Sequence, residues 1–160
     1  MKKTPIAEIN RAHNVTVLSI SPLAEDHAHL EGILNKISPW ALCPDSRWDV
    51  RRSYSLASAM AFLREERFPI VVCEGDLLPD WKKMLEQLAQ VANSPFLIVT
   101  SRLADESLWA DALNLGAYDV LAKPFDNREV VRVLSLAWLH WKEQQQTPER
   151  VEALGMSLAQ

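Results

Sequence analysis

The residues of this sequence that are best suited to chemistry lie at the ends of short apolar runs. Glu74, Thr100 and Lys123 each close such a run. Together they offer a carboxylate, a hydroxyl and an ammonium group, which are the groups by which proteins hold charged or polar ligands. The spacing of the chain places no Ser–His–Asp or Cys–His arrangement beside them, so the sequence favours ligand binding or signalling over nucleophilic catalysis.

The elements that must position these residues follow a simple alternation. Amphipathic stretches, whose apolar residues recur at helical spacing, alternate with five strand-like runs at 15–20, 48–52, 70–73, 96–99 and 118–122, of which 48–52 is the weakest. This alternation indicates βαβ units and a parallel sheet with helices on both faces. We therefore predict an α/β fold with a doubly wound, five-stranded parallel sheet of the flavodoxin-like kind. In such a sheet the functional crevice lies beyond the carboxyl ends of the strands, where the three polar residues fall.

Local signals predict several helix ends. Ser21 reads as an N-cap with Pro22 at the first helical position, and Gly116 stands where a helix C′ glycine belongs. Asp126 is expected to cap the last helix, which should run to about Lys142. Asp80 is a further expected cap, at the start of the third helix. We expect a leader over 1–13, a compact domain over 14–142 and an extension over 143–160 that is a frayed end, a short packing helix or a linker.

Composition narrows the class of protein. The 160 residues carry 17 Lys+Arg and 21 Asp+Glu, which gives a net charge of 17 − 21 = −4 and disfavours direct binding to nucleic acid. No apolar stretch reaches the ~18–20 residues that span a bilayer, and the start lacks the apolar core of a signal peptide. Cys43 and Cys73 are too few for a disulfide framework or a zinc site. We expect a cytoplasmic protein without membrane contact.

The fifth apolar run carries the most specific motif. Residues 116–125 read Gly-Ala-Tyr-Asp-Val-Leu-Ala-Lys-Pro-Phe. This segment resembles the strand-five signature of response-regulator receiver domains, Gly-Ala-x-Asp-Tyr-Leu-x-Lys-Pro-Phe. Residues 95–101 resemble their strand four, which ends in Thr or Ser, and residues 69–74, followed by Pro79, resemble their strand three. The resemblance covers roughly residues 14–142.

The resemblance implies a module of two-component or phosphorelay signalling. In receivers, a partner histidine kinase supplies a phosphoryl group to an aspartate after strand three, and an acidic pair after strand one holds Mg²⁺. A lysine and a Thr or Ser contact the phosphoryl oxygens, and an aromatic residue on strand five reports the change to the partner-binding face. By this pattern Lys123 matches the lysine, Thr100 the hydroxyl, and Pro124 the proline that follows a cis peptide bond.

The match fails at three kinds of position. The acidic pair falls on Ser21 and Pro22, neither of which is a charged Mg²⁺ ligand. The phospho-acceptor position falls on Glu74, with Gly75 a poorer match because the following loop differs by one residue from the usual spacing. The aromatic switch position is Val120. The departures therefore predict no metal cofactor.

These departures lead to the hypothesis of a pseudo-receiver, which acts by protein–protein interaction and lacks standard aspartate phosphorylation. Glu74 is one methylene longer than aspartate and could hold its carboxylate near Thr100 and Lys123 as a fixed, partial mimic of the phosphorylated state. One alternative is a phosphorylatable single-domain response regulator that uses Asp76 or another relocated acid with Mg²⁺, with self-catalysed phosphotransfer as its only catalysis. Another is a flavodoxin-like binding protein or enzyme, although no Gly-rich phosphate loop follows the first strand.

The first helix offers two acids and two histidines near the same crevice. Glu25 and Asp26 are either displaced metal ligands or acids that favour the positive end of the helix dipole, which is the commoner role. His27 and His29 are two residues apart, so they point to different faces and we assign both to structure or solvent.

The last helix predicts a partner face. Leu136 and Leu139 should project away from the stripe that packs on the sheet, and exposed apolar groups can mark an interface. In receivers the fourth helix, fifth strand and fifth helix bind partners, so a homodimer, a histidine kinase or a downstream signalling protein is expected there. A C-terminal tail that covers this surface is the alternative.

Overall fold

The sheet is parallel throughout. In the computed structural model, which describes residues 14–36, 47–78 and 80–158, five strands pair in the order β2-β1-β3-β4-β5. The strands are β1 (Asn14–Ile20), β2 (Arg47–Ser53), β3 (Ile70–Glu74), β4 (Phe96–Ser101) and β5 (Asp119–Ala122). The predicted doubly wound fold is confirmed. The predicted leader 1–13 and Pro79 lie outside the described residues.

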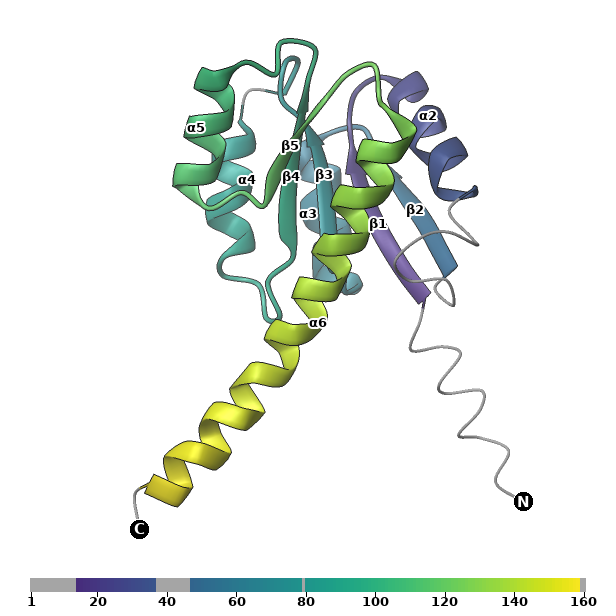
Figure 1. Cartoon of the computed structure of the whole chain (residues 1–160). Helices are drawn as coiled ribbons and strands as arrows, with labels where there is room; N and C mark the ends of the chain where they lie inside the picture. Colours follow the sequence, from purple (N-terminus) through teal and green to yellow (C-terminus); the bar gives the residue numbers. More distant parts are fainter. Residues whose placement is uncertain (1–13, 37–46, 79, 159–160) are drawn as a thin grey trace, which may run out of the picture.

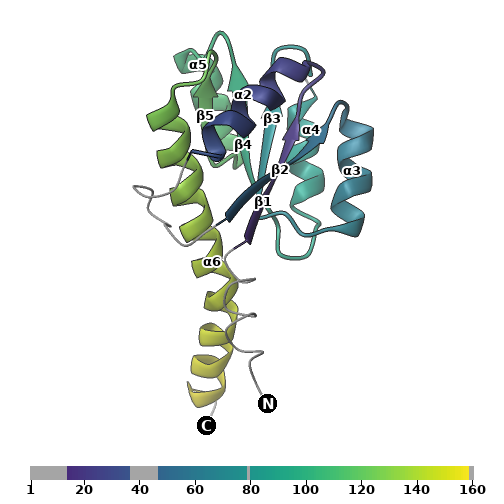
Figure 2. The same cartoon turned by 90° about the vertical axis from the view of Figure 1, so that its right-hand side faces the viewer.

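The helices divide between the two faces of the sheet. They are α2 (Ala24–Leu34), α3 (Leu56–Glu65), α4 (Trp81–Leu88), α5 (Glu106–Leu115) and α6 (Asn127–Leu158). Helices α2 and α6 cover one face and share one apolar cluster, and α3 and α4 lie on the opposite face (Figure 2). Helix α5 contributes Ala112 to a second apolar cluster, which it shares with α3 and α4. Strands β3 and β4 are buried by both layers, which explains their uninterrupted apolar sequences.

Most helix ends follow the local signals. Gly116 ends α5 with a φ of +104°, a left-handed conformation that glycine adopts without strain. The Asp126 carboxylate accepts hydrogen bonds from the backbone N–H groups of Arg128 and Glu129 at the start of α6. Asp80 takes the N-cap position of α4, but its side chain makes no capping hydrogen bond.

The predicted start of the first helix is wrong by two residues. Helix α2 begins at Ala24, with Leu23 as its N-cap residue, and Pro22 is not part of it. The reason lies in the sheet, because the backbone N–H of Ser21 still donates to the carbonyl of Ser53 at the end of β2 (3.0 Å). The Ser21 hydroxyl instead accepts from the backbone N–H of Leu23 (3.1 Å).

The predicted end of the last helix is also wrong. Helix α6 does not stop near Lys142 but continues to Leu158, and its last part extends away from the sheet (Figure 1). Three Gln and three Glu residues are the most frequent types in this continuation, and both favour helix. The described helices include none that is long and apolar enough to cross a bilayer.

The predicted exposed apolar face is not found on α6. Leu136 and Leu139 are partly buried, and Leu139 packs against the cluster beneath α6. The side of α6 that carries them is therefore partly covered by the domain itself. Helix α5 instead exposes Trp109, Leu113 and Leu115, at 42%, 41% and 52% of their surfaces.

His27 is a buried structural residue at the carboxyl end of β1. Its side chain is fully buried, with Nε2 2.9 Å from the carbonyl oxygen of Ser21 and Nδ1 2.8 Å from the Ser19 hydroxyl. A carbonyl can only accept, so Nε2 carries the proton and Nδ1 accepts from Ser19. Burial lowers the pKa of His27, because the charged imidazolium would lose its hydration.

This burial predicts a pH-dependent stability. The unfolded chain takes up a proton near the ordinary histidine pKa of about 6.5, and the folded chain does so only at lower pH, so the free energy of unfolding should fall as pH drops below about 6.5. His27→Gln should cost about 2 kcal/mol at pH 7.5 and remove this slope, as measured by urea denaturation between pH 7.5 and 5.5. His29→Gln, at an exposed position of the same helix, should keep the slope. An unchanged slope in His27→Gln would contradict the assignment.

Candidate functional site

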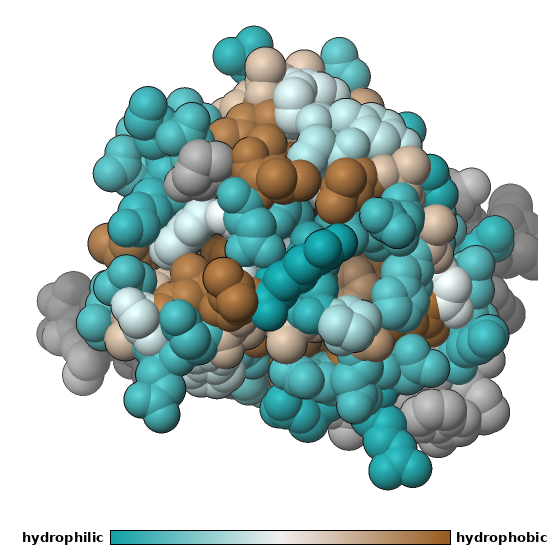
Figure 3. All heavy atoms as spheres, turned by 90° about the horizontal axis from the view of Figure 1, so that it is seen from above, coloured by the Kyte–Doolittle hydropathy of each residue, from teal (hydrophilic) through white to brown (hydrophobic). Residues whose placement is uncertain are grey.

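The predicted site residues meet at one end of the molecule. The carboxyl ends of the strands lie at the top of Figure 1, and the segments that follow β1, β3, β4 and β5 all reach this end. Figure 3 looks down on it and shows hydrophilic residues across the centre, with hydrophobic residues exposed on either side. The sheet register places Glu74 directly beside Thr100.

Glu74 is buried and anchors the loop after β3. Its surface is 1% exposed, and its Oε1 and Oε2 atoms accept hydrogen bonds from the backbone N–H groups of Asp76 (2.7 Å) and Leu77 (2.8 Å). Oε1 also lies 3.3 Å from Nζ of Lys123. The carboxylate is therefore turned into the site and both of its oxygens are engaged.

Lys123 lies between two carboxylates. Its side chain is 6% exposed, and Nζ contacts Oδ2 of Asp26 at 3.1 Å as well as Glu74. Asp26 accepts a further hydrogen bond from the Ser21 hydroxyl at 2.7 Å. A buried ammonium costs several kcal/mol of lost hydration unless well-placed partners offset it, and here two anions do so. The peptide bond from Lys123 to Pro124 is cis, as the resemblance implied.

Asp26 is the site residue that the sequence analysis did not select. Its place in the first turn of α2 predicted a helix-dipole role or a displaced metal ligand. In the structure it instead pairs with Lys123, 97 positions further along the chain. The available signal was its position just after β1, because the first turn of α2 lies at the same edge of the sheet as the end of β5.

The hydroxyl that contacts the β3–α4 loop belongs to Ser101 and not to Thr100. Ser101 Oγ donates to Oδ1 of Asp76 at 2.6 Å, while Thr100 contributes its backbone carbonyl, which accepts from Gly75 N–H at 2.8 Å. Successive side chains of a strand point to opposite faces, so only one of the two hydroxyls can face this loop. The prediction that Glu74 lies near Lys123 agrees with the geometry, whereas no hydrogen bond joins Glu74 to the Thr100 hydroxyl.

Asp76 is held by the end of β4. Besides Ser101, the backbone N–H of Arg102 donates to its Oδ2 at 2.8 Å. Desolvation alone would raise the pKa of Asp76, but these two hydrogen bonds and the charge of Lys123 outweigh it and hold the pKa below its usual range. Gly75 permits this close approach of the loop, because a Cβ there would lie 2.9 Å from a Val99 methyl group.

The remaining predicted positions have different surroundings. Pro22 is exposed, and Val120 is 1% exposed within the apolar cluster under α3, α4 and α5, so the position of the aromatic switch is filled by a core side chain. Cys73, beside Glu74, is also buried, and burial raises the pKa of its thiol to about 12. That thiol is therefore uncharged and packs as a small apolar group.

The donor set at this end of the sheet does not fit Mg²⁺. The described residues contain no group of three or more His, Cys, Asp or Glu side chains that could hold a metal ion. Asp26 and Glu74 are nearby carboxylates, but both contact the Lys123 ammonium, which would repel a divalent cation. Ser21 and Pro22 supply no charge in their place.

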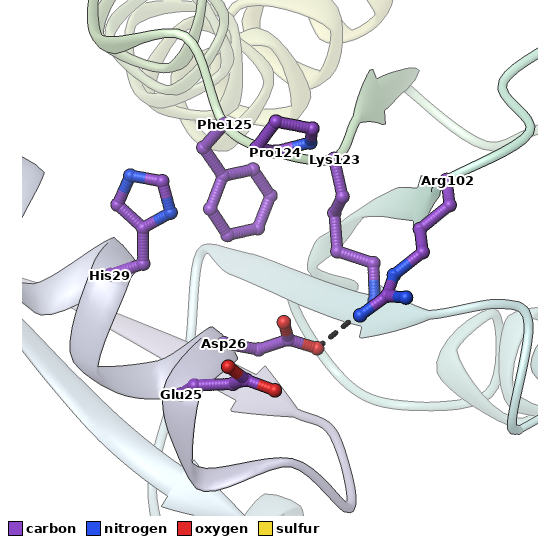
Figure 4. Close-up of a pocket in the computed structure, with 7 residues that line it drawn as sticks. All are labelled: Glu25, Asp26, His29, Arg102, Lys123, Pro124 and Phe125. Atoms are coloured by element: carbon purple, nitrogen blue, oxygen red, sulfur yellow. Dashed lines mark hydrogen bonds and ion pairs between the residues drawn. The ribbon is translucent and has the colours of Figure 1, made fainter.

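A pocket opens beside this ion cluster. It holds about 520 Å³ and lies between the first turns of α2 and the loops after β4 and β5. Figure 4 shows Glu25, Asp26, Arg102 and Lys123 with their charged groups directed toward one another at its polar side. The rings of His29 and Phe125 form the opposite side, with their centroids 5.3 Å apart.

The anchoring of Asp76 predicts a measurable contribution to stability. Asp76→Asn should lower the free energy of unfolding by about 1 kcal/mol at pH 7, because the amide loses the charge and one of the two acceptor oxygens. The pKa of Asp76 is lower in the folded chain than in the unfolded chain. The difference in free energy of unfolding between wild type and Asp76→Asn should therefore stay constant down to about pH 5 and narrow as pH falls below about 3.9. Denaturant titrations at pH 7, 5 and 3.5 measure it, with Asp111→Asn on the exposed side of α5 as the control. Equal stability of Asp76→Asn and wild type at pH 7 would refute the anchoring role.

Comparison with known proteins agrees with this fold. No family model matches the chain. A curated relative, the transcriptional regulatory protein CpxR of Klebsiella pneumoniae subsp. pneumoniae (strain HS11286), is 42% identical over 67 residues. The match covers 41% of this chain and 28% of that protein, so this chain matches less than a third of the relative's length.

Solved structures match over most of the chain. The signal receiver domain of an HD domain-containing protein from Pseudomonas fluorescens Pf-5 is 20% identical with a TM-score of 0.69, and the match covers 84% of this chain and 93% of that one. A response regulator from Thermotoga maritima is 17% identical with a TM-score of 0.67, and the match covers 78% and 97%. The resemblance first drawn from the strand-five motif is thereby confirmed, and the chain has the fold of response-regulator receiver domains.

Proposed function

We propose that this chain is a receiver-like signalling module of the cytoplasm that acts by binding other proteins, without phosphorylation of an aspartate. The observation that carries the proposal is the buried Lys123 ammonium between the carboxylates of Glu74 and Asp26. In receivers the matching lysine pairs with a phosphoryl oxygen. Here two fixed carboxylates take the place of that oxygen.

The charges support a built-in mimic of the modified state. An acyl phosphate adds nearly two negative charges, whereas one carboxylate supplies a single charge. Asp26 and Glu74 together place two negative charges on Lys123, which is closer to the charge of the phosphorylated state than Glu74 alone. The sequence-based hypothesis named only Glu74 as the mimic of the phosphoryl group. The geometry supports Asp26 as a second negative charge of that mimic.

The same groups disfavour phosphorylation at Glu74. Both of its oxygens already accept backbone hydrogen bonds, and one of them also contacts Lys123. An incoming phosphoryl donor would meet the negative charges of Glu74, Asp26 and Asp76 at close range. With Ser21 and Pro22 at the positions of the acidic pair, no metal ligand is available there to offset that repulsion.

A second candidate function is phosphorylation at Asp76. This carboxylate is exposed at the mouth of the site, and its lowered pKa keeps it ionised. It would then be the acceptor of a single-domain response regulator that depends on Mg²⁺. Against this candidate, both Asp76 oxygens are engaged by the end of β4.

Incubation with a small phosphodonor separates the two candidates. We expect intact mass spectrometry to show no stable addition of one phosphate to the wild-type chain after treatment with acetyl phosphate and Mg²⁺. Under this proposal Trp81 fluorescence should not respond to Mg²⁺, because we expect no cation site close to α4. Stoichiometric addition in the wild type would overturn the proposal, and its loss in Asp76→Asn, but not in Asp111→Asn, would establish the second candidate.

We propose that partners bind at α5, at the edge of the surface formed by α5, β5 and α6. Helix α5 exposes Trp109 and Leu113, and a shallow apolar pocket of about 530 Å³ lies against them. Clustered exposed apolar side chains commonly mark interfaces. A histidine kinase, a downstream signalling protein and a second copy of the chain are the proposed partners, with a homodimer as the form that can be tested on the protein alone.

The homodimer predicts a change in size with concentration. Wild-type protein should shift toward the dimer in sedimentation velocity as its concentration rises, and Trp109→Glu/Leu113→Glu should remain monomeric with little change in melting temperature, because both side chains are exposed. Leu77→Glu, at an exposed apolar residue outside α5, should behave as wild type. A wild-type chain that stays monomeric at high concentration would contradict the homodimer.

A further inference from the structure

The pocket beside the ion cluster contains charges that the signalling proposal does not use. Asp26 and Lys123 satisfy each other, and Asp26 also receives the Ser21 hydroxyl. Within the described residues, the carboxylate of Glu25 and the guanidinium of Arg102 have no hydrogen bond or ion pair. They come from different elements, the first turn of α2 and the loop after β4, and both line the pocket.

Figure 4 shows how these two unpaired charges are placed. The side chains of Glu25 and Arg102 point into the same polar side of the pocket from opposite walls, with the Asp26–Lys123 pair beside them. A purely anionic ligand would meet Glu25 and Asp26, and a purely cationic ligand would meet Arg102 and Lys123. A ligand that carries one charge of each sign can satisfy both walls at once.

The rest of the pocket adds a requirement for apolar surface. Phe125 and His29 form an aromatic side of the pocket, in which His29 is exposed and Phe125 is largely buried at 9% exposure. A volume of about 520 Å³ lies in the range of small-molecule sites and is large enough for an amino acid with an aromatic side chain. The pocket therefore has a few convergent charged groups on one side and an apolar, aromatic surface on the other.

We propose that this pocket binds a small zwitterion with an apolar body, of the class of free amino acids. Arg102 holds the carboxylate of the ligand, Glu25 holds its ammonium, and the apolar side chain lies against Phe125 and His29. This inference goes beyond the proposed signalling function, since it concerns a ligand and not a protein partner, and the two can fail separately. A bound zwitterion would contact the first turn of α2 and the loop between β4 and α5 at the same time.

A panel of related ligands tests the proposal on the full chain. Phenylalanine should bind in isothermal titration calorimetry, whereas phenylalanine amide, which lacks the carboxylate, and N-acetylphenylalanine, which lacks the ammonium, should each bind about tenfold more weakly, since a charge-assisted hydrogen bond is lost. Glycine should bind more weakly than phenylalanine because it leaves the aromatic side empty.

Two variants test which side chain of the pocket contacts which charged group of the ligand. In Arg102→Gln, phenylalanine and its amide should bind equally, and in Glu25→Gln, phenylalanine and N-acetylphenylalanine should bind equally. Arg128→Gln and Glu86→Gln, at exposed charged residues outside the pocket, should leave the preference of the wild type unchanged. Because all four positions are exposed, circular dichroism should report the same melting temperature for each variant.

Three results would overturn the proposal. One is the absence of saturable phenylalanine binding, and another is equal binding of phenylalanine and both analogues to the wild-type chain. The third is a preference for the zwitterion that survives in Arg102→Gln and Glu25→Gln. None of these results depends on whether the chain can be phosphorylated or dimerises, so the outcome is separate from the tests of the proposed function.

Discussion

The site depends on one buried cation. The Lys123 side chain is only 6% exposed, so its ammonium group stays charged only if nearby anions compensate for the lost hydration. The two carboxylates that do so come from α2 and β3. The ion cluster therefore joins the segments after β1, β3 and β5 at the carboxyl edge of the sheet. Loss of either anion would leave a poorly compensated charge at the junction of these segments.

The same carboxylates also organise the backbone around them. Glu74 receives the N–H groups of the loop after β3, and Asp76 in that loop receives donors from the end of β4. A continuous series of polar contacts thus leads from α2 through Lys123 to the segment that begins α5. Under the proposed function, this series connects the fixed negative charges with the helix that exposes Trp109 and Leu113.

The layers of the fold explain why the cluster can be buried. Helices α2 and α6 pack on one face of the sheet, and the neutral imidazole of His27 holds the end of β1 against the start of α2. That contact places Asp26, one residue earlier, at the edge of the sheet where Lys123 ends its own strand. Gly75 adds the close approach of the β3–α4 loop to β4, which brings Asp76 within reach of Ser101.

The amino-acid sequence alone determined the strands, the parallel sheet, the Gly116 and Asp126 helix ends and the proximity of Glu74 to Lys123. These features depend on local periodicity, on capping chemistry and on the rule that parallel strands end at one edge. Only the tertiary structure decided that Asp26 is the second anion, that Ser101 faces the loop in place of Thr100, and that α2 begins after Pro22. Each of these depends on how a helix is rotated or how two strands are aligned, and such contacts between distant segments leave no mark on local residue patterns.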